Sequence, residues 1–261
     1  MRHRESTLWA VLALPALALI VMPLAALTSR STTADLVAVL SRAETQQAIL
    51  LSLRTTLLAI LFVTILGLPL ARFIAGSKNR LSRIVDVISD LPIVLPPAAA
   101  GIALLAAFGR QGWPGEILDN WGLQITFTST AVVIAQIFVA LPYFVRSTVE
   151  GLRRVDPDTL SAAAVDGASL FQLVSLIQLP QCRSAILAGI LLGWARAVGE
   201  FGATLMFAGN FVGRTQTMPL AVYAGFETDL DIAISLSVIL LALSILTLAL
   251  ARWVVSSALE I

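Results

Sequence analysis

Two residues of opposite charge stand inside a long apolar stretch in the last third of the chain. Arg196 and Glu200 lie within residues 184–207, whose other side chains are mostly apolar or small. A spacing of four places them on one face of a helix, where they can form an ion pair. A single charge at the centre of a bilayer costs roughly 2.5–3.5 kcal/mol. Two interpretations stay open: a neutral pair that holds helices together, or a pair that faces a transport pathway or a dimer seam.

Three prolines interrupt a second apolar stretch, residues 84–108. Together they break the backbone hydrogen-bond ladder of a helix. Unpaired carbonyls at membrane depth are tolerated only where protein covers them or where they line a wet cavity. A helix that lines a pathway and a kink packed in a bundle both fit this pattern. The candidate pathway or gate residues are therefore Pro92, Pro96, Pro97, Arg196, Glu200 and Thr204.

The stretch 156–180 is more polar and is typical of two short helices joined by a turn. Asp156 is a predicted N-cap, and the proline after it suits the first helical position. Gly167 permits the left-handed turn that ends a helix. Ser169 and the glutamine three residues on have the spacing of a capping box. Pro180 is predicted to stop the second helix.

Small and apolar residues recur along this stretch at steps of three and four, as on one face of a helix. An ordinary interfacial helix explains such a stripe, and so does a knob that docks into a groove on a soluble partner. The stripe consists of Leu160, Ala164, Gly167, Phe171 and Val174.

The composition indicates an integral membrane protein. Of the 261 residues, 58% are hydrophobic and 13% are charged, against about 25% charged in an average soluble domain. The net charge of +1 gives no basis for a nucleic-acid partner. Cys182, the only cysteine, is expected to be a small buried hydrophobe. His3 is the only histidine, so the sequence holds no His/Cys metal cluster.

Six apolar stretches are long enough to cross a bilayer, which needs about 20 residues. We predict an all-α membrane protein with one transmembrane domain, residues 1–261. The first stretch is interpreted as a retained helix, because it is too long for the h-region of a signal peptide. The predicted spans are about 8–28, 48–75, 84–108, 127–148, 184–207 and 232–255.

The positive charges predict an orientation. With the N-terminus in the cytoplasm, the inner ends and loops hold most of the 17 Lys and Arg residues, as expected for inner segments. Both termini and residues 149–183 are then cytoplasmic, in a multi-pass protein of the cell membrane. Arg54, near the outer start of the second span, is expected to snorkel to the interface.

With these elements in place, the stretch 156–180 resembles the EAA loop of ABC importer permeases. In that family the loop is cytoplasmic and supplies a coupling helix that sits in a cleft of the ATPase subunit. The resemblance implies the type I, MetI-like permease fold. Ser161 stands where the family usually has glutamate, which leaves a charged contact at that position open. The implied ATPase contacts are Ser161, Ala162, Ala163, Ala164, Asp166, Gly167, Ala168, Phe171, Leu179 and Pro180.

Three further segments resemble one branch of that family, the molybdate permeases and their sulfate and tungstate relatives. They are DLPIVLPPAAAGIALLAAFGRQG (90–112), RAVGEFGATLMFAGN (196–210) and GRTQTMPLAVY (213–223). The resemblance implies import of a tetrahedral oxyanion, with molybdate favoured and sulfate, thiosulfate or tungstate as alternatives.

The same resemblance implies partners for this chain. They are a second copy of it in a homodimer, two subunits that bind ATP and Mg, membrane lipid, and an extracytoplasmic substrate-binding protein. The loop 208–231 would receive the binding protein, and Arg214 there is either a salt-bridge partner or a solvated side chain. The docking candidates are Asn210, Arg214, Thr215 and Thr217.

The implied mechanism is alternating access driven by ATP, with no cofactor and no ATPase chemistry in this chain. The sequence indeed has no G-x-x-x-x-G-K-[ST] loop. A secondary transporter or channel working without ATP is the main rival, and inverted repeats would favour it, but the halves show no clear self-similarity. A membrane enzyme would need clustered Asp, His or Ser within the spans, where only Arg196 and Glu200 are expected.

Overall fold

All the regular elements in the part of the chain that the structure describes are helices. The computed structural model describes residues 2–77 and 79–259, and the side chains of residues 2–8, 10, 251 and 254–259 lie outside the described part. Expectations for Lys78 and for the side chains of Arg2, His3 and Arg4 therefore stay predictions. The helices are α1 (Arg2–Ser29), α2 (Thr33–Leu40), α3 (Ala43–Gly76), α4 (Arg80–Val94), α5 (Pro97–Phe108), α6 (Trp113–Asn120), α7 (Ser129–Arg153), α8 (Pro157–Val165), α9 (Leu170–Gln172), η1 (Leu173–Gln178), α10 (Leu179–Gln181), α11 (Arg183–Val198), α12 (Gly202–Ala208), α13 (Met218–Thr228) and α14 (Leu230–Leu259).

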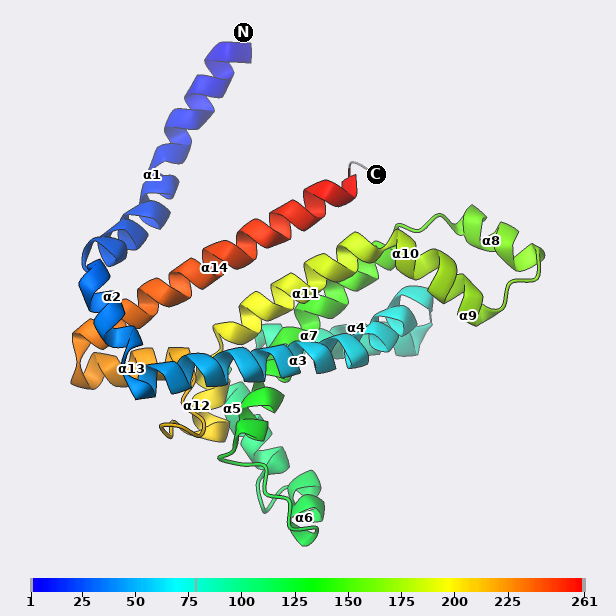
Figure 1. Ribbon diagram of the computed structural model, residues 1–261. Coiled ribbons are helices and arrows are strands. Elements are labelled where there is room, and N and C mark those ends of the chain that lie inside the picture. Colours follow the sequence, from blue (N-terminus) through cyan, green and yellow to red (C-terminus); the bar gives the residue numbers. More distant parts are fainter. Residues whose placement is uncertain (1, 78, 260–261) are drawn as a thin grey trace.

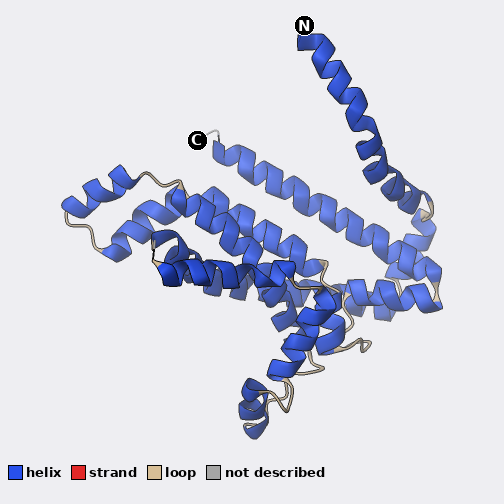
Figure 2. Ribbon diagram, turned by 180° about the vertical axis from the view of Figure 1, so that it is seen from behind, coloured by secondary structure: helices blue, strands red, loops and turns tan. Residues whose placement is uncertain are grey.

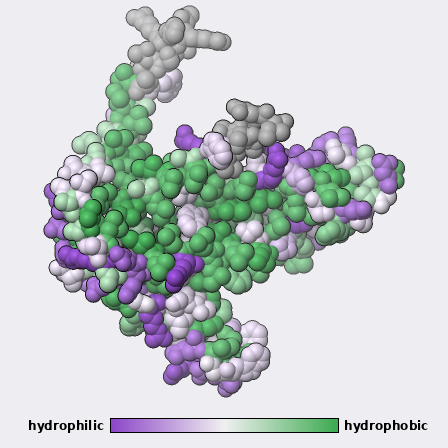
Figure 3. Space-filling view, viewed as in Figure 1, coloured by the Kyte–Doolittle hydropathy of each residue, from purple (hydrophilic) through white to green (hydrophobic). Residues whose placement is uncertain are grey.

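Four helices, α1, α3, α7 and α14, contain segments long and apolar enough to cross a membrane. Two bent pairs raise the possible number to six: α4 with α5, bent by 116°, and residues 170–181 with α11, bent by 70°. The predicted spans 48–75 and 232–255 each fall within one helix. The all-α fold is confirmed. On the face shown in Figure 3, the surface over the bundle is mostly hydrophobic, and hydrophilic residues gather on the projecting ends.

Two predicted spans are broken rather than continuous. The stretch 84–108 is divided between α4 and α5, because Pro96 and Pro97 lack the donors that would continue α4, and Pro97 instead opens α5. The stretch 184–207 is divided between α11 and α12, with residues 199–201 outside any helix. That second break contains no proline, and the expectation of one continuous helix there is wrong.

The helices α3, α7 and α11 form the centre of the bundle, and α5 and α12 pack beside α7 (Figure 1). Small residues let these helices approach closely, as is common between membrane helices. A Cβ atom on Gly67 of α3 would lie 2.5 Å from Cδ1 of Phe144 on α7, and the Phe144 side chain is fully buried. The interior at this crossing is therefore fitted to a glycine.

The ends of the bundle differ in shape. The helices α8, α9 and α10 project from one end, and α2 and α13 lie at the opposite end (Figures 1 and 2). α6 extends from the far end of α5, and α1 leans away from the rest of the chain (Figure 1). None of the apolar segment Val11–Ser29 of α1 is buried within this chain.

We expect Gly67→Ala to lower the free energy of unfolding by about 1–3 kcal/mol, because the added methyl group overpacks a site closed by the Phe144 ring. The measurement is the thermal unfolding midpoint of the detergent-solubilised protein. Gly193→Ala is the matched control. Its added Cβ would lie 3.3 Å from the flexible tip of the Ile60 side chain, and alanine has a higher helix propensity than glycine. Equal midpoints for the two variants would contradict the packing argument.

Candidate functional site

The projecting segment, residues 156–181, starts with a well-capped helix. The Asp156 carboxylate accepts hydrogen bonds from the backbone N–H of Asp158, at 3.1 Å, and of Thr159, at 3.3 Å, and from the Thr159 hydroxyl, at 2.9 Å. These hydrogen bonds hold the pKa of Asp156 below its usual range, and the bond from the Asp158 N–H has the largest effect. The predicted N-cap is thus present, and the carboxylate lies at the positive end of the helix dipole.

Gly167 ends α8 as predicted, with φ +89°. The N–H of Ala168 bonds to the carbonyl of Ala163 and that of Gly167 to Ala164, which together make a Schellman motif. No atom lies within 4 Å of the position that a Cβ on Gly167 would take. Backbone conformation alone, rather than space, therefore requires glycine here.

The second helix of the segment starts with the predicted capping box. Ser169 accepts from the N–H of Gln172 at 3.3 Å, and its own N–H donates to Gln172 Oε1 at 2.8 Å. This helix continues through η1 and α10 and ends at Gln181, one residue after Pro180, where the chain bends by 70° into α11. The predicted stop at Pro180 is therefore met to within one residue. The π-helical turns of η1 shift the hydrogen-bond register just before the proline, which lacks a donor.

The segment presents apolar side chains to its surroundings. Phe171 is 79% exposed and Val165 is 88% exposed, and Leu170 and Leu176 are also exposed. The Ser161 hydroxyl turns back onto its own helix and donates to the Pro157 carbonyl at 2.8 Å. Of the residues that the resemblance assigned to ATPase contact, Ala163, Ala168 and Leu179 are half-buried and the others are exposed.

The segment is attached to the bundle where α7 meets α11. Leu179 packs against the core cluster that contains Phe144 and Cys182. A Cβ on Gly151 of α7 would meet the side chains of Ala185 and Cys182, so the two helices touch closely at this point. The segment, α7 and α11 are thus in direct contact at this junction.

The two breaks in the predicted spans lie against each other. A Cβ on Gly202, the first residue of α12, would lie 2.6 Å from the Cβ of Pro97, the first residue of α5. Further along, a Cβ on Gly101 would lie 2.7 Å from the carbonyl oxygen of Ala203. Pro92 is half-buried, and Pro96 and Pro97 are exposed in the single chain. Of the predicted gate residues, Pro97 thus lies at the start of α12, between Glu200 and Thr204 in sequence.

Arg196 and Glu200 form an ion pair across the second break. Arg196 Nη1 lies 2.6 Å from Glu200 Oε2, and the Glu200 side chain is 1% exposed against 26% for Arg196. Glu200 Oε1 accepts from the backbone N–H of Ala203 at 2.7 Å. The carboxylate therefore replaces part of the backbone hydrogen bonding that the break removes, and its charge is compensated where it is buried.

Other polar groups lie close to this break. Gln136 Nε2 on α7 donates to Thr56 Oγ1 at 3.1 Å and to the carbonyl of Ala197 at 3.2 Å. Gln136 Oε1 and the hydroxyl of Thr204 are buried and have no hydrogen-bond partner in the described residues. Buried polar groups are usually paired, so these two give the interior near the break unpaired polar atoms.

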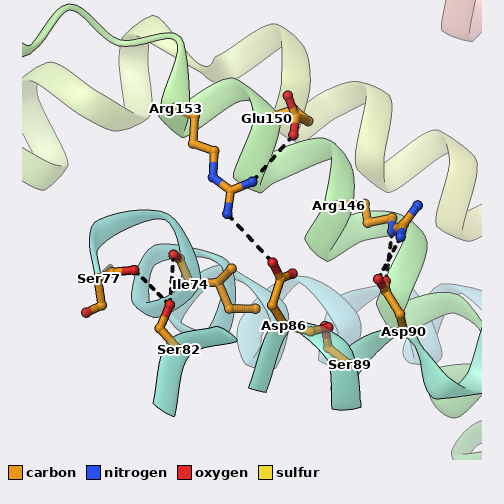
Figure 4. Close-up of polar contacts among 9 residues, drawn as sticks. All are labelled: Ile74, Ser77, Ser82, Asp86, Ser89, Asp90, Arg146, Glu150 and Arg153. Carbon is orange, nitrogen blue, oxygen red and sulfur yellow. Dashed lines mark hydrogen bonds and ion pairs between the residues drawn. The ribbon is translucent and has the colours of Figure 1, made fainter. Parts of the chain in front are cut away.

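A set of ion pairs that sequence reasoning missed joins α4 to α7 (Figure 4). Arg146 makes a bidentate contact with Asp90, at 2.8 and 2.6 Å, and Arg153 lies 3.7 Å from Asp86. Asp86, Asp90 and Arg146 fall within predicted spans, so the expectation that only Arg196 and Glu200 carry charge there is wrong. The spacing of four between Asp86 and Asp90 was the available signal.

The loop after α12 presents some docking candidates and buries others. Arg214 is exposed, and Asn210 is half-buried and donates to the Leu220 carbonyl at 3.4 Å. Thr215 is fully buried, and its hydroxyl accepts from the N–H of Phe211 at 3.0 Å. Thr217 is also buried. In this chain the two threonines shape the loop rather than form its surface.

Comparisons with known proteins agree with this architecture. The sequence profile of the family described as "Binding-protein-dependent transport system inner membrane component" matches residues 67–259. The "Molybdenum transport system permease protein ModB" of Mycobacterium tuberculosis is 41% identical over 236 residues, which cover 89% of each protein. The "Probable transport system permease protein NifC" of Clostridium pasteurianum is 42% identical over 207 residues, 79% of this chain and 72% of the relative.

Among solved structures, a chain of a bacterial ABC transporter involved in alginate import superimposes with a TM-score of 0.74 at 15% identity, over 99% of this chain and 97% of that chain. This likeness supports the fold, and the sequence relatives carry the family assignment. The multi-pass architecture, with the projecting segment at one end and two helix breaks that lie against each other, agrees with the sequence relatives and with this fold. The chain therefore belongs to the family of inner membrane components of binding-protein-dependent transport systems.

Proposed function

We propose that this chain is the permease subunit of an ATP-driven importer of a tetrahedral oxyanion, with molybdate as its substrate. The observation that carries the proposal is the sequence similarity to the mycobacterial molybdenum permease, which is 41% identical over 89% of both chains. The gate segments 90–112 and 196–210, which resemble the molybdate branch, are the ones that meet at the paired helix breaks.

The exposed apolar side chains of the projecting segment favour a protein partner on that side. Phe171 and Val165 stand on short capped helices, as a knob for a groove requires. We propose that two ATP-binding subunits, which would hold the ATP and Mg, take these knobs from the two chains of a homodimer. The permease would then have no catalytic residues of its own.

The proposed orientation in the membrane follows from the ATP-binding subunits, because ATP is in the cytoplasm. The projecting segment and both termini would face the cytoplasm, and α2, α6 and α13 would face a substrate-binding protein outside. Exposed Arg214 and half-buried Asn210 then stay docking candidates. The whole chain would act as one permease domain with six spans, two of them broken, in the cell membrane.

In the proposed mechanism, closure of the ATPases moves residues 156–181, and α11 carries that motion to the break at residues 199–201. Rearrangement there would open the contact between Gly202 and Pro97. The buried oxygens of Gln136 and Thr204 would then meet water or the passing anion. Glu200 offsets the charge of Arg196, which suits a transient contact rather than a tight binding site for the anion.

The proposed function predicts ATP-dependent uptake of radiolabelled molybdate by vesicles that contain this chain, its ATPase and its binding protein. Unlabelled tungstate and sulfate are added as competitors. Uptake by the purified chain without ATPase would overturn the importer assignment and favour a secondary transporter. Uptake of sulfate in preference to molybdate would overturn the choice of anion alone.

We expect Gly167→Ala to lower molybdate uptake per ATP hydrolysed, because a side chain at φ +89° strains the turn by about 1–2 kcal/mol and reorients the two helices. Gly122→Ala is the matched control, because Gly122 has φ +74° and also has open space around it, but lies outside the projecting segment. The ratio of uptake to hydrolysis is measured for both. A normal ratio for Gly167→Ala would place the coupling contact elsewhere.

Arg196→Gln is expected to destabilise the protein by about 3–5 kcal/mol, because Glu200 is left buried without its counter-charge. The double variant Arg196→Gln, Glu200→Gln should recover most of that stability, since no charge stays unpaired. If the pair acts in the gate, the double variant stays defective in uptake although its unfolding midpoint is restored. Full recovery of both quantities would show a purely structural pair.

A further inference from the structure

A groove between α3 and α7 is polar at one end and apolar at the other. It has a volume of about 510 Å³ and includes none of the gate residues. Leu51, Arg54, Ser129 and Thr130 line the end nearest the starts of the two helices, and the remainder is mostly apolar, with Leu58, Phe62 and Ile137 among its residues.

The change in polarity runs along the helix axes. On α3, Phe62 follows Arg54 by eight residues, which is about 12 Å of helix. On α7, Ile137 follows Ser129 by the same interval. Thr56 bonds to Gln136 and Gly67 lies against Phe144, so the two helices run parallel. Arg54 and Thr130 therefore lie nearer the helix starts than Phe62 and Ile137 do.

Arg54 is available to an external anion. Its side chain is exposed and forms no ion pair with the carboxylates of the described residues. An arginine on a membrane-spanning helix has a high free-energy cost unless its guanidinium reaches a polar group. A guanidinium matches the oxygens of a phosphate with two parallel hydrogen bonds.

We propose that this groove is a phospholipid site. The phosphodiester lies on Arg54 with the hydroxyl of Thr130 beside it, and one acyl chain follows Leu58, Phe62 and Ile137 between the helices. A transported oxyanion does not fit as well, because the deeper part of the groove offers it no polar contact. A helix from another protein would cover the apolar part, but would need a carboxylate at the level of Arg54.

The position of the site places lipid beside the loop that follows α12. Ser129 Oγ donates to the backbone carbonyl of Arg214 at 3.0 Å, so the headgroup lies beside the loop that follows α12. The acyl chain would fill the space between two helices of the central bundle.

The test uses the complete transporter in vesicles of phosphatidylethanolamine and phosphatidylglycerol with a trace of phosphatidylglycerol that carries a photoreactive acyl chain. After illumination, labelled peptides are mapped by mass spectrometry. We expect label on the α3 and α7 peptides that contain Phe62 and Ile137. Arg54→Gln should lower this labelling about fivefold, as expected for the loss of one cationic contact to phosphate. Arg54→Lys should retain most of it.

Arg110→Gln is the control, because Arg110 is exposed and lies outside this groove. Each variant is accepted only if its unfolding midpoint equals that of the wild type, and Arg54→Lys keeps the test valid if Arg54→Gln fails to fold. The proposal is overturned if the wild type takes no label at these peptides, which would mean that protein covers the groove. It is also overturned if Arg54→Gln leaves the labelling unchanged, or if inorganic molybdate displaces the label and so places the groove on the anion route.

Discussion

The structure depends on how two interrupted helices satisfy their backbone hydrogen bonds away from water. In hydrocarbon an unpaired N–H or carbonyl costs several kcal/mol, so a break is stable only where protein closes over it. Here the two breaks lie against each other: Gly202 lies against Pro97, and α5 and α12 cross where Gly101 meets Ala203. Pro96 and Pro97 keep an exposed side in the single chain. The Glu200 carboxylate supplies an acceptor at the start of α12, and Arg196 neutralises it.

The helices α7 and α11 connect this interior contact to the projecting segment. The helix α11 starts after the buried Cys182, which is in the core cluster that Leu179 of the projecting segment packs against, and it ends at the break. Gln136 of α7 bonds to the carbonyl of Ala197, one turn before Glu200. The α4–α7 ion pairs fix the other broken helix to the same α7. The helices α4, α11 and α12, which flank the two breaks, thus contact the same long helix, α7.

Helix-capping rules could predict much of the projecting segment, because its caps involve residues that are neighbours in sequence. Asp156, Gly167 and Ser169 all have the predicted roles. The break at residues 199–201 could not be found in this way, because a buried carboxylate rather than a proline stabilises it. The pairing of Asp90 with Arg146 joins residues 56 positions apart, and the burial of Thr215 and Thr217 depends on the loop folding back over the bundle. Such tertiary effects leave little trace in a single sequence.

The burial of Cys182 has a practical consequence for spectroscopy. The thiol is 2% exposed, and burial raises its pKa, so little reactive thiolate exists near neutral pH. The natural chain is accordingly a nearly silent background for maleimide dyes and nitroxide spin labels. Single cysteines introduced at exposed positions can report distances during the transport cycle without first rebuilding the junction between α7 and α11.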